Sequence, residues 1–217
     1  MEKEFAETHP SKYDISDIAL SLKSRGYVIK NAKRDGEWLF MRRGKLTPTS
    51  RLPRAKVIPN RREGEKLVRK NNMGDDWTLE QLKDAAILEL QRIIILANKY
   101  NDAPTTIEHV IKLASLLTSK KAIILYNGRG EYYIDAEINS FGHIKYINTT
   151  PDFLDTWFFP SVRAAEKRVD ELQPLAGYDN FSVDSVADIA RLALENIGES
   201  ADSQTELELR IVANNEN

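Results

Sequence analysis

The chain contains no cysteine, and this absence excludes several kinds of chemistry. Without thiols there can be no disulfide, no thiolate nucleophile and no zinc or iron–sulfur site held by cysteine. No apolar run reaches the ~18 residues that a membrane-spanning helix needs, so we expect no membrane association. The first residues, Met-Glu-Lys-Glu-Phe-Ala-Glu, are acidic and lack the basic-then-apolar order of a signal peptide. These absences favour a cytoplasmic protein.

Histidine is scarce, and recognisable catalytic motifs are missing. His9, His109 and His143 are the three histidines, and their positions follow no metal-type spacing. The P-loop frame, the nucleophile elbow and the His-Glu-x-x-His pattern are also absent. His143 can meet Asp135 or Glu137 across a hairpin as an acid–base or metal pair, but a half-exposed cross-strand pair is the favoured interpretation. We therefore expect no catalytic residue, no metal and no cofactor.

Charge is distributed very unevenly along the chain. The formal net charge is −2, yet residues 23–70 hold sixteen Lys and Arg against four Asp and Glu, a local charge of +12. Residues 131–217 hold six Lys and Arg against seventeen Asp and Glu, a local charge of −11. Such asymmetry indicates either that the basic part binds a polyanion or that the two parts neutralise each other.

The N-terminal 43 residues predict a small unit of one helix and a β-hairpin. Apolar residues over 15–22 follow helical spacing, and Gly26 supplies a left-handed stop. Two β-prone runs, at 27–29 and 38–41, flank the turn signal Asp35-Gly36.

Residues 44–74 show no regular period and predict a basic linker or arm. Pro48, Pro53 and Pro59 each bias the preceding residue away from helix. A short helix at 63–70 is an alternative for the end of the segment. We therefore place a domain boundary here.

Two helices at 78–118 form the segment around which the rest of the larger domain, 75–198, is expected to pack. Each begins with a capping box, at Thr78 and at Thr105, and a short break at 101–104 makes them an antiparallel helical hairpin. The first helix is apolar on almost every side, which predicts burial by several neighbours. Those neighbours are either the rest of the chain or a second copy, so a homo-oligomer through 78–118 is predicted.

The remainder predicts an antiparallel sheet and two C-terminal helices. Strands are expected at 122–126, 131–137 and 143–147, followed by a helix over 162–172 and a last helix capped by Ser182. Residues 199–217 predict a mobile acidic tail, with a further strand as the alternative. No internal repeat is apparent. The predicted fold class is α+β, with an N-terminal helix and β-hairpin, a basic linker, a helical hairpin, a small antiparallel sheet and C-terminal helices.

One pattern within 131–172 resembles a box found in small proteins of phages and prophages. The box has a Tyr-Tyr-Ile strand, a Trp, and then Phe-x-Ser/Thr-x-x-x-Ala-Glu opening a helix. The residues that match it are Tyr132, Tyr133, Ile134, Trp157, Phe159, Ser161, Ala165 and Glu166. The Gly-Asn that usually precedes the Phe is replaced by Trp157-Phe158. The resemblance implies a mobile-element origin, with the host cytoplasm as location, and implies no activity. Physically, the pattern describes a strand and a helix that pack together.

The leading functional hypothesis is a non-enzymatic accessory protein that binds DNA or RNA through the basic segment 23–70. Cations that neutralise phosphates release counterions, and this contribution does not depend on base sequence. Trp38 is a candidate for stacking on bases beside Arg42 and Arg43. The predicted nucleic-acid-binding residues are Trp38, Arg42, Arg43, Lys45, Arg51, Arg54, Lys56, Arg61 and Arg62. No helix-turn-helix, zinc-finger or RNP pattern predicts a sequence-specific reader.

The alternative function is a protein-interaction module. A host-enzyme inhibitor or a component of virion assembly or DNA packaging would act through an oligomeric helical hairpin and the acidic C-terminal half. In that case the basic segment is a solvated linker, or it folds against acidic residues of its own or a neighbouring chain.

Overall fold

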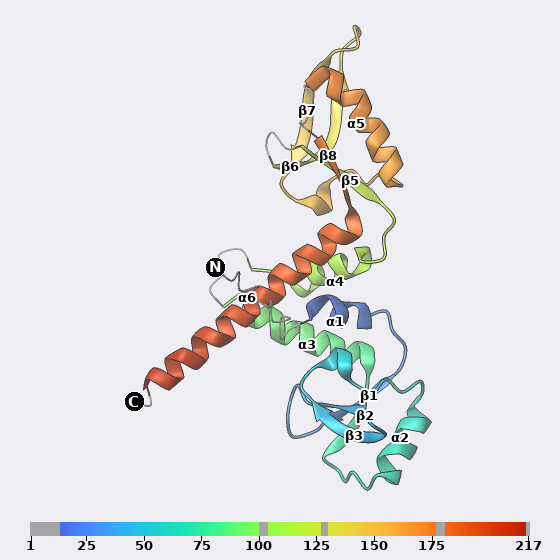
Figure 1. Ribbon diagram of the computed structural model, residues 1–217, viewed down its shortest axis with the longest axis vertical. Coiled ribbons are helices and arrows are strands. Elements are labelled where there is room, and N and C mark those ends of the chain that lie inside the picture. The colour runs from blue at the N-terminus through green and yellow to red at the C-terminus, as the bar shows by residue number, and fades with distance from the viewer. Residues whose placement is uncertain (1–13, 100–103, 127–129, 177–180, 216–217) are drawn as a thin grey trace, which may run out of the picture. The chain divides into compact units, whose positions relative to one another are not determined.

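The computed structural model describes residues 14–99, 104–126, 130–176 and 181–215 (Figure 1). Helices and two antiparallel four-stranded sheets in this part of the chain confirm the α+β class, with an N-terminal helix followed by a hairpin. The chain forms two compact units, Met1–Ala114 with Ala193–Asn217, and Ser115–Leu192. None of the described helices combines the length and the apolar character needed to cross a bilayer.

The first sheet and its helices come from the N-terminal part of the chain. The elements are α1 (Ile15–Ser21), β1 (Tyr27–Asn31), β2 (Trp38–Arg42), β3 (Lys45–Thr49), the 3-10 turn η1 (Leu52–Arg54), α2 (Arg61–Lys70), β4 (Trp77–Gln81) and α3 (Leu82–Ala97). The strands are ordered β3-β2-β1-β4. Helix α2 packs on β1 and β4, and α1 packs on α3 (Figure 1).

The second sheet is built from the same succession of elements. These are α4 (Ile107–Leu116), β5 (Ala122–Tyr126), β6 (Glu131–Ile138), β7 (Ile144–Thr150), the 3-10 turn η2 (Phe153–Asp155), α5 (Val162–Ala176), β8 (Phe181–Ser185) and α6 (Val186–Asn215). The strand order, β7-β6-β5-β8, reproduces that of the first sheet. We call α1 to α3 the first repeat and α4 to α6 the second repeat.

Backbone hydrogen bonds identify equivalent positions in the two repeats. Tyr27 and Ile58 exchange two hydrogen bonds of 2.8 Å, and Ala122 and Phe159 exchange the equivalent two, of 3.0 and 2.8 Å. Each of the second partners is followed by a proline. The amide N–H of Leu82 donates to the carbonyl of Gly26 at 2.9 Å, as the N–H of Val186 does to Lys121 at 3.1 Å. The expectation that the chain contains no repeat is therefore wrong.

The repeat is hard to see in the sequence because residue class, rather than residue identity, is kept. The clearest match is Trp-Thr-Leu-Glu-Gln-Leu at 77–82 with Phe-Ser-Val-Asp-Ser-Val at 181–186. Both segments are a strand that pairs antiparallel with the first strand of its sheet and then enters a helix. The predicted helix caps Thr78 and Ser182 therefore lie in β4 and β8 instead. Pairing with the first strand of each sheet overrides the local cap signal at these two positions.

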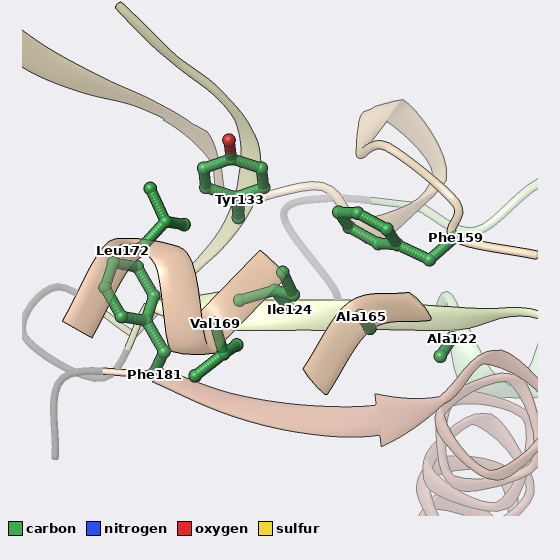
Figure 2. Close-up of a cluster of buried hydrophobic side chains, with 8 residues drawn as sticks. All are labelled: Ala122, Ile124, Tyr133, Phe159, Ala165, Val169, Leu172 and Phe181. Carbon is green, nitrogen blue, oxygen red and sulfur yellow. The ribbon is translucent and has the colours of Figure 1, made fainter. Parts of the chain in front are cut away.

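Each sheet has an apolar core beneath one helix, which is α2 in the first repeat and α5 in the second. In the first sheet, Ile29, Leu39 and Ile58 form a buried cluster, and Leu67 and Val68 of α2 pack against it. Figure 2 shows the second cluster, where residues of α5 lie over the strands. Its members are Ala122, Ile124, Tyr133, Phe159, Ala165, Val169, Leu172 and Phe181. Tyr133 is held further by Arg168, whose Nε and Nη2 donate to the phenol oxygen at 3.1 and 3.0 Å.

Three predicted segment boundaries differ from the structure. The expected linker at 44–74 contains β3, η1 and α2, and β3 pairs with β2 along its whole length. The expected boundary there is absent, because α2 covers the same core as the strands of 1–43. Residues from 199 onward are expected to form a mobile tail, but in the structure they continue helix α6 to Asn215.

Candidate nucleic-acid interface

Trp38 is buried, which corrects its predicted role as a stacking residue. Only 2% of its surface is exposed, and it pairs across the sheet with Lys30 and Thr49. Within the described residues its indole Nε1 is buried without a hydrogen-bond partner. Because the ring has no open face, Trp38 is part of the core.

The β2–β3 hairpin carries three of the predicted cations at its tip. Arg42 and Lys45 are directly opposite each other, and Arg43 and Gly44 form the two-residue turn. Both turn residues have positive φ, 48° and 77°, which is the conformation of a type I′ hairpin turn. Arg42, Arg43 and Lys45 are exposed, and within the described chain none of them forms an ion pair. This hairpin tip is a compact cationic projection.

Arg51 and Arg54 lie in a different place, beside acidic residues. They line a cavity of about 280 Å³ together with Asp14, Asp17 and Glu89. Burial, followed by the nearby Asp14 carboxylate, raises the pKa of Asp17. Glu89 is itself buried and accepts from Arg92 Nη2 at 2.5 Å. With three carboxylates in the same lining, this cavity does not suit a phosphate.

Helix α2 concentrates the cations on its outer face. Its inner face is made by Gly64, Leu67 and Val68, so the helical period turns another set outward. That set, which we call the basic face, is Arg62, Lys66, Arg69 and Lys70, and it lines an open hollow of about 640 Å³ with Glu65. Within the described residues, no member of the basic face is paired with a carboxylate.

The two remaining predicted residues lie at the start of α2. Lys56 lines a second hollow of about 330 Å³, floored by Val57, Pro59 and Leu67 and rimmed also by Lys66 and Lys70. We call this hollow the α2 groove. Arg61 donates to Glu65 at 3.0 Å, so it is the one predicted cation with a carboxylate partner among the described residues. The positive charge of Arg61 is therefore partly neutralised within the helix by Glu65.

The basic face occurs only in the first repeat and is not a requirement of the fold that the two repeats share. In the second repeat the same positions on α5 are Arg163, Lys167, Asp170 and Glu171. Two cations are thus replaced by two carboxylates, and the formal charge of the face falls to zero. Since both helices pack on their sheets in the same way, packing does not require the cations of α2.

Lys66, Arg69 and Lys70 belong to the site but are not among the residues predicted from the sequence. A signal for them is present, because Arg62, Lys66 and Arg69 recur at helical spacing. The prediction of a linker at 44–74 leaves that signal unused, although the alternative of a short helix at 63–70 agrees with α2.

The cross-strand pair considered for His143 with Asp135 or Glu137 is not formed in the described part of the chain. His143 is exposed, and within the described chain its hydrogen bonds run to Asn139, with its backbone N–H donating to Oδ1 at 3.0 Å. Glu137 instead accepts from Lys145 Nζ at 3.1 Å, and hydrogen bonds from Tyr146 and Lys145 lower the pKa of Glu137. No cluster of three potential metal ligands occurs in the described part of the chain.

Comparison of the chain with family models, with curated proteins and with solved structures yields no match. The function is therefore inferred from the charges and contacts of the described residues.

Proposed function

We propose that this protein is a non-enzymatic nucleic-acid-binding accessory protein that grips phosphates with α2 and the tip of the β2–β3 hairpin. The observation that carries the proposal is the basic face of α2, four exposed cations with no described ion pair. A cation without an internal partner is available to neutralise a phosphate, and the counterions that the nucleic acid then releases drive binding.

The comparison between repeats supports this assignment. If the cations of α2 served only solubility, a mixture of positive and negative charges would serve equally well. Helix α5 of the second repeat carries such a mixture. Instead the first repeat concentrates like charges on one helical face, where neighbours three and four residues apart repel one another. A polyanionic ligand offsets that repulsion. The mobile-element origin implied by the sequence resemblance is compatible with such a protein.

The proposal is tested by fluorescence anisotropy with labelled single-stranded and duplex DNA and RNA of about 16 nucleotides at low salt. We expect binding that the double variant R62Q/K66Q weakens for every nucleic acid. The matched control K83Q/K120Q removes two exposed cations elsewhere and should leave binding nearly intact. Absence of binding at low salt, or an equal loss in both variants, would contradict the proposal.

The assembly alternative has one specific observation in its favour. Leu88 and Ile95 on α3 are 49% and 71% exposed, and their spacing of seven residues places them on one side of the helix. A homo-oligomer through this face would cover both side chains. Light scattering of the 24.7 kDa chain, with L88K/I95K as the disrupting variant, distinguishes a monomer from an oligomer.

A further inference from the structure

The two repeats differ in a systematic way at their exposed positions. At the hairpin tip of the first repeat, Arg43 precedes a glycine with φ of 77°. In the second repeat Phe141 precedes Gly142, which has φ of 80°, in the β6–β7 connection. Phe141 is 83% exposed. A single exposed apolar side chain is ordinary on a protein surface, so Phe141 becomes informative only together with a second exposed ring.

At the edge of the α2 groove, a cation of the first repeat is replaced by an aromatic residue in the second. Lys56 donates its backbone N–H to the carbonyl of Leu39 at 2.8 Å, and Trp157 donates to the equivalent Tyr133 at 3.4 Å. Trp157 therefore occupies the place of the lysine that rims the α2 groove, and it is 61% exposed. Lys56 and Trp157 are thus equivalent positions, where a cation in the first repeat is replaced by an exposed ring in the second. Arg43 and Phe141 share only their place before a glycine near the tip of a hairpin, because the β6–β7 connection is longer than the two-residue β2–β3 turn.

We propose that the second repeat binds unpaired nucleobases by stacking on Phe141 and Trp157, so that the preferred ligand is a single-stranded nucleic acid. The inference rests on the proposed function, since it names the ligand class of the same protein. Cations and flat aromatic rings are the two components that a single-strand-binding surface combines, the first for phosphates and the second for bases. In a duplex the base faces are stacked on one another and cannot be reached, whereas phosphates remain accessible.

The second repeat carries cations as well as the exposed rings. Arg163 and Lys167 are exposed on α5 at the positions of Arg62 and Lys66, although Asp170 and Glu171 bring the formal charge of this face to zero. Lys121 Nζ lies 5.7 Å from the ring centroid of Phe158, beside Trp157 in sequence. This contact places one cation at the residue that follows Trp157 in the chain.

The test compares single-stranded and duplex DNA of identical sequence, using W157A, W157F, F141A and the control L192A. Leu192 is 54% exposed on α6, so L192A removes a comparable exposed apolar side chain away from the proposed rings. We expect W157A and F141A each to weaken single-strand binding about 5- to 150-fold, the range found when a stacking aromatic is removed. Duplex binding should be nearly unchanged, and W157F should keep most of the single-strand affinity because it retains a ring.

A spectroscopic measurement separates stacking from a general loss of structure. Trp38 is buried, whereas Trp157 is exposed, so a base stacked on Trp157 should quench the part of the fluorescence that W157F lacks. A poly-abasic strand, which has phosphates but no bases, should bind wild type and W157A equally and cause no quenching. Equal affinity of wild type for single strand and duplex, or W157A that binds single strands as L192A does, would overturn the inference and leave the exposed rings to a protein partner. The basic-face variants would still lose binding in that case, so failure here is distinguishable from failure of the proposed function.

Discussion

Gly64 of α2 lies directly against the side chain of Leu79 in β4. A Cβ added at Gly64 would lie 2.8 Å from Leu79 Cδ1 and closer still to Cδ2, so a methyl group here requires the Leu79 side chain to shift. In the second repeat the same two places are held by Ala165 and Val183, which belong to one core cluster. Each repeat thus fills this space once, either with a longer side chain on the strand or with a methyl group on the helix.

This exchange predicts a compensating pair of substitutions. G64A alone should destabilise the protein by about 1–3 kcal/mol, because overpacking outweighs the helix propensity that alanine adds. L79V alone should cost about 0.5–1.5 kcal/mol for the lost methylene. The double variant G64A/L79V, which imports the pair of the second repeat, should be more stable than G64A alone. Urea unfolding of the four proteins measures the coupling, and purely additive effects would contradict the correspondence of the repeats.

The N-cap of α2 gives a second prediction. Asn60 Oδ1 accepts from the backbone N–H of Glu63 at 2.9 Å, and its amide donates to the Glu63 side chain at 2.9 Å. Ser161 caps α5 in the same position, accepting from the N–H of Ala164 at 3.2 Å. N60A should therefore cost about 0.5–2 kcal/mol in thermal or chemical unfolding, while N60S should cost much less. If N60S proves as harmful as N60A, the cap is not what holds this helix end.

How much of this fold the sequence predicts depends on how local the signal is. The hairpin over β1 and β2, the antiparallel pairing of β5 with β6 and the helix over 162–172 all follow from signals within a few positions, while the turn predicted at 127–130 lies largely outside the described residues. Strands β4 and β8 do not, because Thr78 and Ser182 look like helix caps and only pairing with a strand about fifty residues away makes them strands. The charge of 23–70 can be counted from the sequence. That Arg51 and Arg62 lie at different sites depends on the tertiary structure, which places Arg51 in a cavity with Asp14 and Arg62 on the basic face of α2.

A pH-dependent prediction concerns Glu137 and Tyr146. The hydrogen bond between them and the ion pair with Lys145 lower the pKa of Glu137 below its ordinary 4.5, and the same hydrogen bond, followed by the charge of Glu137, raises the pKa of Tyr146. A lowered carboxyl pKa means stability that is present above pH 4.5 and lost as the pH falls through the folded-state pKa. Wild type should therefore melt slightly above E137Q at neutral pH and not at strongly acidic pH.

The direct check is an NMR titration of the Glu137 side chain. In Y146F the pKa of Glu137 should move upward toward 4.5, because the hydrogen bond from the phenol is gone. The exposed Glu166, which has no described ion pair, provides the control E166Q, whose melting difference from wild type should not follow the same pH course. A pKa of Glu137 that is unmoved in Y146F would show that the phenol does not stabilise this carboxylate.

A substitution at Trp38 tests whether this residue belongs to the core or to the binding surface. Since its ring is buried, W38F should change stability and leave the nucleic-acid affinity of the folded protein as it was. Affinity measured at a temperature where both proteins are fully folded by circular dichroism checks this. A selective loss of affinity in W38F would restore Trp38 to the binding surface.

The central claim, that the basic face of α2 binds phosphates, is tested most directly by the salt dependence of binding. The logarithm of the association constant is plotted against the logarithm of salt concentration between about 50 and 200 mM for wild type, R62Q/K66Q and K83Q/K120Q. We predict a steep negative slope for wild type and an unchanged slope for K83Q/K120Q. On a single strand, R62Q/K66Q should reduce the slope by about 0.7 for each phosphate that it no longer neutralises. A slope that is the same in wild type and R62Q/K66Q would contradict the account.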